Sequence, residues 1–247
     1  MIQAVIFDLD GTLVKTEQLK AISYAKAAAQ LCPRDVSEAE VVEAFKDVVG
    51  LSRREVAAGL MKRFELEQAA RDRMNEFGVK SPWQSFVQIR LRIYNEMLSD
   101  PQTIRDNRWE HALELLDEVN AQACQTGLAT MSYCEQASRV LKILELGDAF
   151  NVVATRDDVE NSKPDPEIYQ LVLAELGVSA AQALVIEDSP AGVEAALNAG
   201  TDVVAVATPF TEARLRELER LPKNRLVDDP AELLGIVKGV FREHAQG

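Results

Sequence analysis

Acidic, hydroxyl and lysine side chains stand close to the points where apolar segments of this sequence end. The residues that could do chemistry are Asp8, Asp10, Thr130, Lys163, Glu187 and Asp188. Several carboxylates in one cleft repel one another, and a hard divalent cation with oxygen ligands relieves that repulsion; Mg²⁺ suits a few carboxylates together with a phosphate group. With a lysine, a threonine hydroxyl and backbone N–H groups added, such a site is predicted to bind a phosphoryl group.

Asp8 and Asp10 have the residue type and the spacing that phosphoryl transfer requires. A carboxylate can attack phosphorus and form an aspartyl phosphate, which is the role that we predict for Asp8. Asp10 can protonate the leaving oxygen and later activate a water molecule. Gly11 allows a turn sharp enough to aim N–H groups at phosphoryl oxygens.

Each of these motifs also has an ordinary structural interpretation. An aspartate before a glycine is typical of a turn, and Ser189 followed by a proline is typical of a helix start. Thr130 could cap a helix, and a single lysine is most often a surface residue. The occurrence of all these motifs at the ends of successive expected strands favours the catalytic interpretation.

The segments that must position these residues alternate between strand-like and helix-like patterns. Strands are expected at 3–8, 125–130, 150–155, 183–188, 201–207 and 224–229, with helices between them from residue 106 onward. This alternation predicts the α/β class, with a doubly wound, Rossmann-like parallel sheet covered by helices on both faces. In such sheets ligands bind at the carboxyl ends of the strands, where the candidate residues lie.

Residues 15–103 carry no strand pattern and are expected to form an inserted all-helical domain. Helices are expected at 15–31, 37–49, 52–63, 65–77 and 81–99. Ser37 and Glu40 have the spacing of a capping box, and Pro101 is expected to stop the last helix. The α/β core is therefore predicted to comprise residues 1–14 and 104–247, and the helical insertion residues 15–103.

Composition limits the classes of function. The chain has 27 Lys and Arg against 40 Asp and Glu, a formal net charge of −13, which disfavours nucleic acid and anionic lipid as partners. Three cysteines without a CxxC pair and two histidines give neither a disulfide framework nor a three-histidine zinc site. No apolar run approaches the ~20 residues of a membrane helix, and the N-terminus lacks the pattern of a secretion signal. We expect a cytoplasmic protein that acts on a small molecule.

Four motifs together resemble the haloacid dehalogenase-like hydrolase superfamily: FDLDGTL, the Thr130 strand end, KPDPEIY and IEDSPAGVEAALNAG. The helical insertion resembles the cap of the branch that contains β-phosphoglucomutase and phosphoglycolate phosphatase. This resemblance implies a Mg²⁺-dependent phosphatase of small phosphorylated metabolites, such as a sugar phosphate or a phosphoglycolate-like compound, working through a phospho-aspartate. We also expect a monomer or a weak homodimer.

Two other functions are compatible with the same motifs. A β-phosphoglucomutase-like phosphosugar mutase is the main alternative, in which a bisphosphate intermediate is retained and reoriented. A non-catalytic metabolite-binding protein on the same scaffold is less favoured, because Asp8, Asp10 and Lys163 are all present.

The resemblance implies a role for each matching residue of the core. Asp8 would be the nucleophile and a metal ligand, and Asp10 the acid and base that also offers its backbone carbonyl to the metal. Asp188 would bind the metal with Glu187 beside it. The residues implied to hold the phosphoryl group are Gly11, Thr130, Met131 and Lys163.

In the insertion, the resemblance implies that the cap selects the substrate. Arg53, in the Gly-x-Ser-Arg stretch 50–53, and Arg90 would contact the distal part of the substrate. Arginine forks suit phosphate or carboxylate groups. The alternative for both arginines is a solvated helix face.

Three departures from the family pattern stand out. Relatives carry an acidic residue at position 15 and a histidine at position 20, where this chain has Lys15 and Lys20, and they carry Pro-Gly where this chain has Trp109 and Glu110. Lysine is charged near pH 7 and is a poor substitute for a proton-shuttling histidine, which weakens the mutase alternative. The added positive charge is expected to favour a more acidic substrate.

Overall fold

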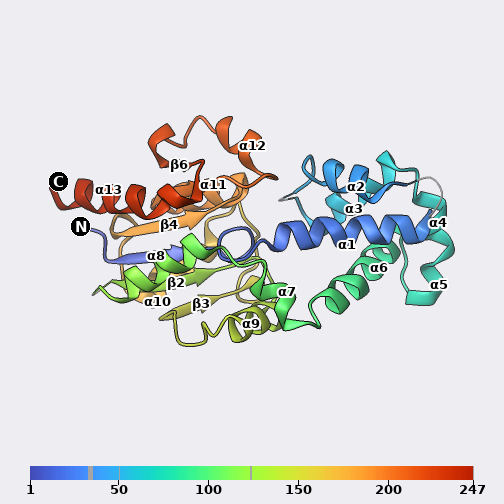
Figure 1. Cartoon of the computed structure of the whole chain (residues 1–247), viewed down its shortest axis with the longest axis horizontal. Helices are drawn as coiled ribbons and strands as arrows, with labels where there is room; N and C mark the ends of the chain where they lie inside the picture. Colours follow the sequence, from blue (N-terminus) through green and yellow to red (C-terminus); the bar gives the residue numbers. More distant parts are fainter. Residues whose placement is uncertain (33–35, 50, 123, 247) are drawn as a thin grey trace. The chain divides into compact units, whose positions relative to one another are not determined.

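The computed structural model describes residues 1–32, 36–49, 51–122 and 124–246 (Figure 1). The chain divides into two compact units. One comprises Met1–Lys15 and Ile104–Gly247 and contains the sheet, and the other comprises Thr16–Thr103 and is helical. The helical unit is therefore inserted in the sequence between the first strand and the other strands of the same sheet.

The α/β unit is built on one six-stranded sheet in which every neighbouring pair of strands is parallel. The strand order is β3-β2-β1-β4-β5-β6. The bounds are β1 (Ala4–Phe7), β2 (Gln125–Ala129), β3 (Val152–Ala154), β4 (Ala183–Glu187), β5 (Asp202–Val206) and β6 (Leu226–Val227). Every residue of β1 and β4 is buried, as expected for strands that are covered on both faces. The predicted fold class is confirmed.

The register of the sheet brings distant parts of the chain to one edge. Phe7 at the end of β1 is paired with Leu128 of β2 on one side and with Ile186 of β4 on the other. The strand order changes direction between β1 and β4, and such a switch point opens a crevice at the carboxyl ends of the strands. The residues that follow Phe7 and Ile186 are therefore neighbours at this crevice.

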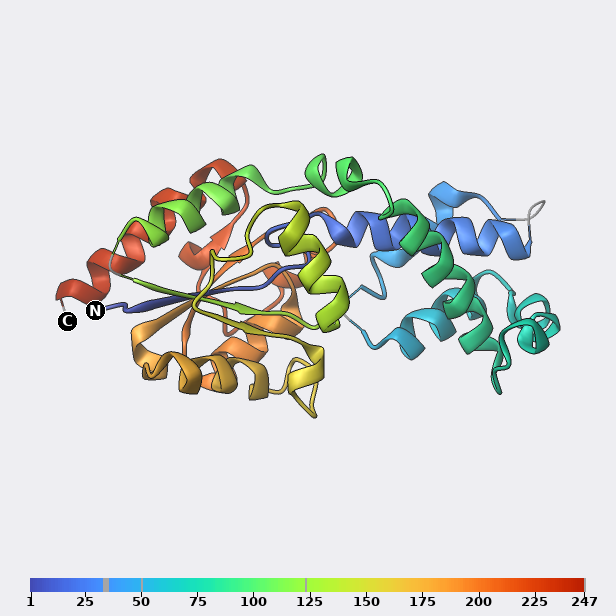
Figure 2. The same cartoon turned by 90° about the horizontal axis from the view of Figure 1, so that it is seen from below.

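Helices cover both faces of the sheet. They are α8 (Glu110–Asn120), α9 (Cys134–Ile143), α10 (Glu167–Leu176), α11 (Pro190–Ala199), α12 (Glu212–Arg216) and α13 (Leu233–Gln246), with short 3₁₀ turns at Arg156–Asp158, Ala180–Gln182, Lys223–Arg225 and Pro230–Glu232. In Figure 2, α8 and α13 lie side by side on one face, and α10 and α11 lie on the other. Tyr169 and Val172 of α10 belong to the fully buried core beneath the sheet.

The helical unit is built around its first and last long helices. Its elements are α1 (Thr16–Leu31), α2 (Glu38–Phe45), α3 (Arg53–Arg63), α4 (Glu67–Asp72), α5 (Met74–Phe77) and α6 (Pro82–Met97), and α7 (Pro101–Arg105) follows at the boundary. Helix α1 packs against both α2 and α6. The Tyr24 ring lies 5.7 Å from the ring of Phe45 and 5.5 Å from that of Phe86, so one aromatic residue joins three helices.

Helix ends in this unit differ from the expected ones in three places. Ser37 begins α2 without a side-chain cap, and the capping box forms instead between Ser52 and Glu55 of α3. The segment expected as one helix at 65–77 is broken at Arg73, whose N–H bonds to Ala70 in a tight turn. Helix α6 ends at Met97, two residues before the expected end and ahead of Pro101, and Pro101 begins the short helix α7, because proline is well suited to a first helical turn.

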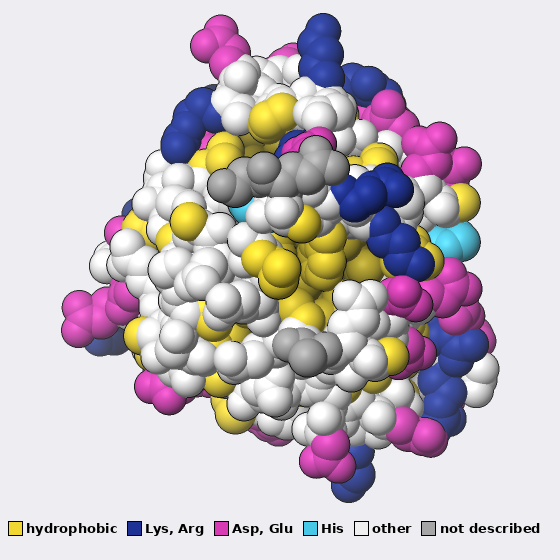
Figure 3. Space-filling view, turned by 90° about the vertical axis from the view of Figure 1, so that its left-hand side faces the viewer, with side chains coloured by type: hydrophobic (Ala, Val, Ile, Leu, Met, Phe, Trp, Pro, Cys, Tyr) yellow, Lys and Arg dark blue, Asp and Glu magenta, His cyan; other side chains and the backbone are white. Residues whose placement is uncertain are grey.

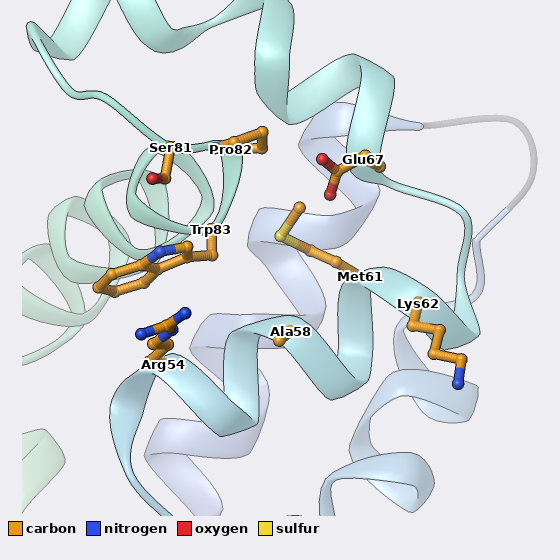
Figure 4. A pocket seen from close by; sticks show the side chains of 8 residues that line it. All are labelled: Arg54, Ala58, Met61, Lys62, Glu67, Ser81, Pro82 and Trp83. Carbon is orange, nitrogen blue, oxygen red and sulfur yellow. The ribbon is translucent and has the colours of Figure 1, made fainter.

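Two surfaces stand out from the packed interior. The helical unit has a hollow of about 500 Å³, lined by Arg54, Ala58, Met61, Lys62, Glu67, Ser81, Pro82 and Trp83 (Figure 4). Figure 3 views another surface, where hydrophobic side chains line a hollow near the middle and Lys, Arg, Asp and Glu side chains lie along its right-hand side. Among the described residues, no helix combines the length and the apolar character needed to cross a membrane.

Candidate active site

Lys163 is the centre of a buried network at the switch point of the sheet. Its side chain is 5% exposed. The Nζ atom donates to Asp8 Oδ1 at 2.7 Å, to Glu187 Oε1 at 2.7 Å and to the carbonyl of Ala129 at 3.0 Å. An ammonium group has three N–H donors, so these three contacts use all of them. The lysine is held in one position at the ends of β1, β2 and β4.

Glu187, the last residue of β4, is a fully engaged carboxylate. Oε1 accepts from Lys163 and from the Tyr169 hydroxyl at 2.9 Å. Oε2 accepts from the N–H groups of Asp188 and Ser189, both at 2.9 Å, and from Ser189 Oγ at 3.0 Å. Five donors on one carboxylate fix its orientation and stabilise its charge in a buried site.

The titration of the network follows from its charges. Burial raises the pKa of Asp8 to about 7; the Lys163 charge opposes this rise, whereas Glu187 and Asp10 reinforce it. Burial also opposes the charge on Lys163, yet the two carboxylates raise the pKa of Lys163 well above its ordinary value. Burial works against ionisation of Glu187 as well, but Lys163 and the other donors bring the pKa of Glu187 below its ordinary value. One ammonium thus compensates Glu187 and leaves Asp8 with excess negative charge.

Three carboxylates meet the geometric requirement for a metal site among the described residues. Asp8, Glu187 and Asp188 each present an oxygen within 4.8 Å of the others, and all three residues are buried. Oxygen donors of this kind suit Mg²⁺. Glu187 meets the distance criterion, but both of its oxygens already accept hydrogen bonds. Asp8 and Asp188 are therefore better suited to bind an ion.

Gly11 leaves room for one of these carboxylates. Its φ of +96° lies in the region that favours glycine, and a Cβ at this position would lie 2.1 Å from Asp188 Oδ2. A side chain here would therefore displace Asp188. From the sequence, Gly11 is expected to hold the phosphoryl group. In the structure the Gly11 N–H donates to the carbonyl of Val14 at 2.7 Å, and its contact with a phosphoryl group stays a prediction.

The loop after β2 carries Thr130, Met131 and Ser132. Thr130 is completely buried, and its Oγ1 accepts the N–H of Ser132 at 3.0 Å, so it serves as a local cap. A hydroxyl that accepts a hydrogen bond keeps its own hydrogen for another acceptor. Met131 is half-buried and packs against the core of the unit. Ser132 Oγ donates to Asp10 Oδ2 at 2.5 Å and so links this loop to the one that follows β1.

Arg53 and Arg90 lie in the helical unit, which is described by itself. Arg53 is exposed, whereas Arg90 is 4% exposed and its guanidinium carbon lies 4.3 Å from the ring of Tyr94 and 5.1 Å from that of Tyr24. Burial raises the pKa of Tyr24, and the charges of Arg90, Arg53 and Lys20 partly oppose the rise. The positive charges of these three side chains therefore favour the ionised form of the Tyr24 phenol. Gly50, the first residue of the Gly-x-Ser-Arg stretch, lies outside the described residues.

Two of the departures from the family pattern are neighbours in the structure. The Lys15 Nζ lies 4.4 Å from the centroid of the Trp109 ring, which is cation–π distance. The same two segments are joined through their backbones, since the Lys15 N–H donates to Asn107 and the Trp109 N–H to Leu13. Lys15 and Trp109 thus fit each other as a pair at the boundary of the α/β unit.

Comparison with known proteins agrees with this arrangement. The family model for haloacid dehalogenase-like hydrolases matches residues 5–206, which include all the core site residues described above. The chain is a member of the haloacid dehalogenase-like hydrolase family. The enzyme class that the motifs indicated is thereby confirmed at the level of the family.

Relatives of this hydrolase include phosphatases and pyrophosphatases. A phosphorylated carbohydrates phosphatase of Thermotoga maritima is 32% identical over 200 residues, covering 81% of this chain and 82% of the relative. A pyrophosphatase PpaX of Bacillus velezensis is 28% identical over 235 residues, covering 95% and 96%. Among solved structures, a β-phosphoglucomutase of Clostridium difficile matches with a TM-score of 0.72 at 21% identity over the full length of both chains, a likeness of fold alone.

Three contributors to the site of this hydrolase were not assigned from the sequence. Tyr169 lies within the KPDPEIY motif, but its contact with Glu187 depends on where α10 packs. A Cβ at Gly192 would lie 1.7 Å from Glu187 Oε1. Ser132 lies two residues after the assigned Thr130, yet serine after a strand is too common to attract attention. Tyr169 and Gly192 lie within motifs that carry the family resemblance, but nothing in the sequence linked either residue to Glu187.

Proposed function

We propose that this hydrolase cleaves phosphate monoesters of small metabolites through a phosphorylated Asp8 and depends on Mg²⁺. The observation that supports the proposal is the position of the Asp8 carboxylate, which is fixed by the Lys163 ammonium group. This carboxylate lies at the end of β1, 2.7 Å from the Lys163 ammonium and within 4.8 Å of an Asp188 oxygen. A carboxylate oriented in this way by a fixed cation is suited to act as a nucleophile.

The reaction divides between two aspartates. Asp8 forms a bond to phosphorus while the bond between phosphorus and the ester oxygen breaks, and Asp10 gives a proton to the departing oxygen. Asp10 then takes a proton from water, and that water breaks the bond between Asp8 and phosphorus to release phosphate. Lys163 keeps the nucleophile in place and offsets negative charge on the aspartyl phosphate, and the Thr130 hydroxyl binds a phosphoryl oxygen.

Asp8 and Asp188, together with the backbone carbonyl of Asp10, would hold the ion. When bound, Mg²⁺ offsets the negative charge of the carboxylates and of the phosphoryl group. The raised pKa of Asp8 and the space that Gly11 leaves for Asp188 support an ion at this place. We assign Glu187 to the anchoring of Lys163 in place of direct metal binding, because five donors already occupy its oxygens.

The helical unit is proposed to select the substrate. Arg53, Arg90 and Lys20 carry positive charge near Tyr24 in that unit, which favours substrates with a second acidic group. Phosphoglycolate-like acids and pyrophosphate meet this description, whereas a sugar monophosphate carries no acidic group besides the phosphate that is cleaved. The pyrophosphatase name of one relative agrees with a second acidic group, and the name of the phosphorylated carbohydrates phosphatase keeps sugar phosphates among the candidates.

The test is phosphate release from a panel of phosphorylated metabolites with Mg²⁺ and with EDTA. We expect release from a few compounds, abolished by EDTA and reduced roughly a thousandfold or more in Asp8→Asn, because that change removes the nucleophile. Wild-type protein that is quenched with acid during turnover should carry a covalent acyl-phosphate label. The Asp8→Asn variant should lack this label. Isomerisation of a sugar phosphate that requires a bisphosphate primer, without net phosphate release, would replace the proposal with the mutase alternative.

A further inference from the structure

Ser132 joins two loops at the catalytic edge of the sheet. Its Oγ donates to Asp10 Oδ2 at 2.5 Å, although the two residues are 122 positions apart in the sequence. Ser132 follows β2 and Asp10 follows β1, and these strands are parallel neighbours. The sheet register therefore creates the contact, and both partners belong to the α/β unit.

The backbone around Ser132 is fixed on both sides. Its N–H donates to Thr130 Oγ1 at 3.0 Å, and its carbonyl accepts the Arg156 N–H at 3.1 Å. Two residues later the Cys134 N–H donates to Asp157 Oδ2 at 2.7 Å. A loop that is tied at these points presents the Ser132 hydroxyl in a defined direction.

A serine hydroxyl is suited to a partner that must both give and take a proton. It can donate to a carboxylate, and after rotation of the hydroxyl it can accept from a carboxylic acid. The same contact can therefore persist in both halves of the proposed reaction.

The position of the Asp10 carboxyl group affects its transfer of protons. Asp10 is half-buried, and Asp8 is buried beside Lys163. A half-buried carboxyl has room for other rotamers, and proton transfer requires the acid to stay within hydrogen-bond reach of the leaving oxygen. A hydrogen bond to one carboxyl oxygen removes part of this freedom.

We propose that Ser132 is a positioning residue for Asp10 and contributes to how well this hydrolase expels poor leaving groups. This inference rests on the proposed function, because it assigns a helper to the proton donor of that reaction. It concerns how Asp10 is held and adds no new chemical step.

The experiment compares Ser132→Ala with wild type on Mg²⁺-loaded enzyme across aryl phosphates of rising leaving-group pKa, from p-nitrophenyl to phenyl phosphate. We expect kcat/KM for phenyl phosphate to fall by about tenfold and that for p-nitrophenyl phosphate by less than about threefold. The loss should appear in kcat, with KM little changed. Ser132→Thr keeps the hydroxyl and should stay within about threefold of wild type on both compounds.

A matched control and a double variant separate this role from a structural one. Ser138→Ala, on α9, removes an exposed hydroxyl whose contact is with Cys134 Sγ, and it should leave the leaving-group series unchanged. In an Asp10→Asn background, Ser132→Ala should cause no further loss, since residues that act as a unit are not additive. A loss that is equal for all leaving groups, or that adds to that of Asp10→Asn, would overturn the positioning role. Absence of Asp8-dependent turnover in wild type would instead overturn the proposed function.

Discussion

Lys163 lies between two buried carboxylates, and one positive charge cannot compensate both of them. The hydrogen-bond pattern decides which carboxylate benefits. Glu187 collects five donors and has a pKa below its ordinary value, whereas the pKa of Asp8 is raised to about 7. The negative charge that is poorly compensated is therefore that of Asp8, the residue that is proposed to attack phosphorus and to bind the ion.

At this scale we predict that Mg²⁺ stabilises the protein more at high pH. The folded-state pKa of Asp8 is raised above its ordinary value of 3.8, so an ionised Asp8 lowers the stability of the metal-free protein as pH rises from about 4 towards 7. Protons also compete with the ion for this carboxylate below about pH 7. The rise in Tm caused by Mg²⁺ should therefore be larger at about pH 8 than at about pH 6.

Thermal unfolding with Mg²⁺ and with EDTA at the two pH values checks this prediction. Asp188→Asn supplies the control, because it removes a proposed ligand and should reduce the Mg²⁺ effect at both pH values. An equal increment at both pH values in wild type would show that Asp8 does not titrate with the ion.

At the scale of elements, the site depends on how closely α11 approaches β4. Ser189 caps α11 by accepting the Gly192 N–H at 3.0 Å, and the same serine donates to Glu187. The first turn of the helix therefore lies directly against the carboxylate that anchors Lys163. Gly192 is the residue that permits this approach, since a Cβ there would lie 1.7 Å from Glu187 Oε1.

We predict that Gly192→Ala damages both stability and catalysis. Overpacking in a filled site typically costs about 1–3 kcal/mol, and displacement of Glu187 would loosen Lys163 and, through it, Asp8. We expect a lower free energy of unfolding in urea and a kcat at least about tenfold lower.

Gly239→Ala is the matched control for this substitution. Gly239 lies in α13 and an added Cβ would meet no atom within 4 Å, so the change should be neutral or stabilise the helix by up to about 1 kcal/mol. If Gly192→Ala behaved like Gly239→Ala in both measurements, the close approach of α11 would not matter to the site.

At the scale of the whole molecule, the chain leaves the α/β unit after Lys15 and returns at Ile104. The insertion enters next to the proposed nucleophile, but the strands on either side of β1 come from beyond residue 124. Substitutions in the helical unit therefore need not alter the sheet. This organisation would separate the proposed substrate selection by the helical unit from the proposed chemistry of Asp8.

We predict that Arg53→Ala changes the ranking of substrates without changing the chemistry. Turnover of metabolites with a second acidic group should fall by about tenfold, because an arginine contact to such a group is lost. Turnover of p-nitrophenyl phosphate, which lacks that group, should stay the same. A metabolite panel beside the aryl phosphate measures the difference.

Arg54→Ala is the comparison for Arg53→Ala. Arg54 is the neighbouring residue, equally exposed, and lines the hollow of the helical unit shown in Figure 4. It should affect neither class of substrate. Equal losses in the two variants would assign the effect to general charge in place of a specific contact.

Several features could be predicted from the sequence because they depend on local patterns. The apolar runs that became β1 and β4 are buried on both faces, and that burial requires the continuous hydrophobicity seen in the sequence. Parallel strands place their carboxyl ends at one edge, so the expectation that Asp8, Thr130 and Glu187 lie there follows from alternation alone. The helical segment expected at 15–103 corresponds closely to the unit Thr16–Thr103.

Other features were decided by tertiary structure, because they depend on which atoms meet across long sequence separations. Spacing could not reveal that five donors occupy Glu187, that the Gly11 N–H is taken by Val14, or that Ser132 reaches Asp10. For a similar reason the capping box expected at Ser37 does not form, whereas one forms at Ser52, since helix ends adjust to packing. The residue types at the site were determined by the sequence, and the sharing of hydrogen bonds and charge among them was determined by the register of the sheet and the approach of α10 and α11.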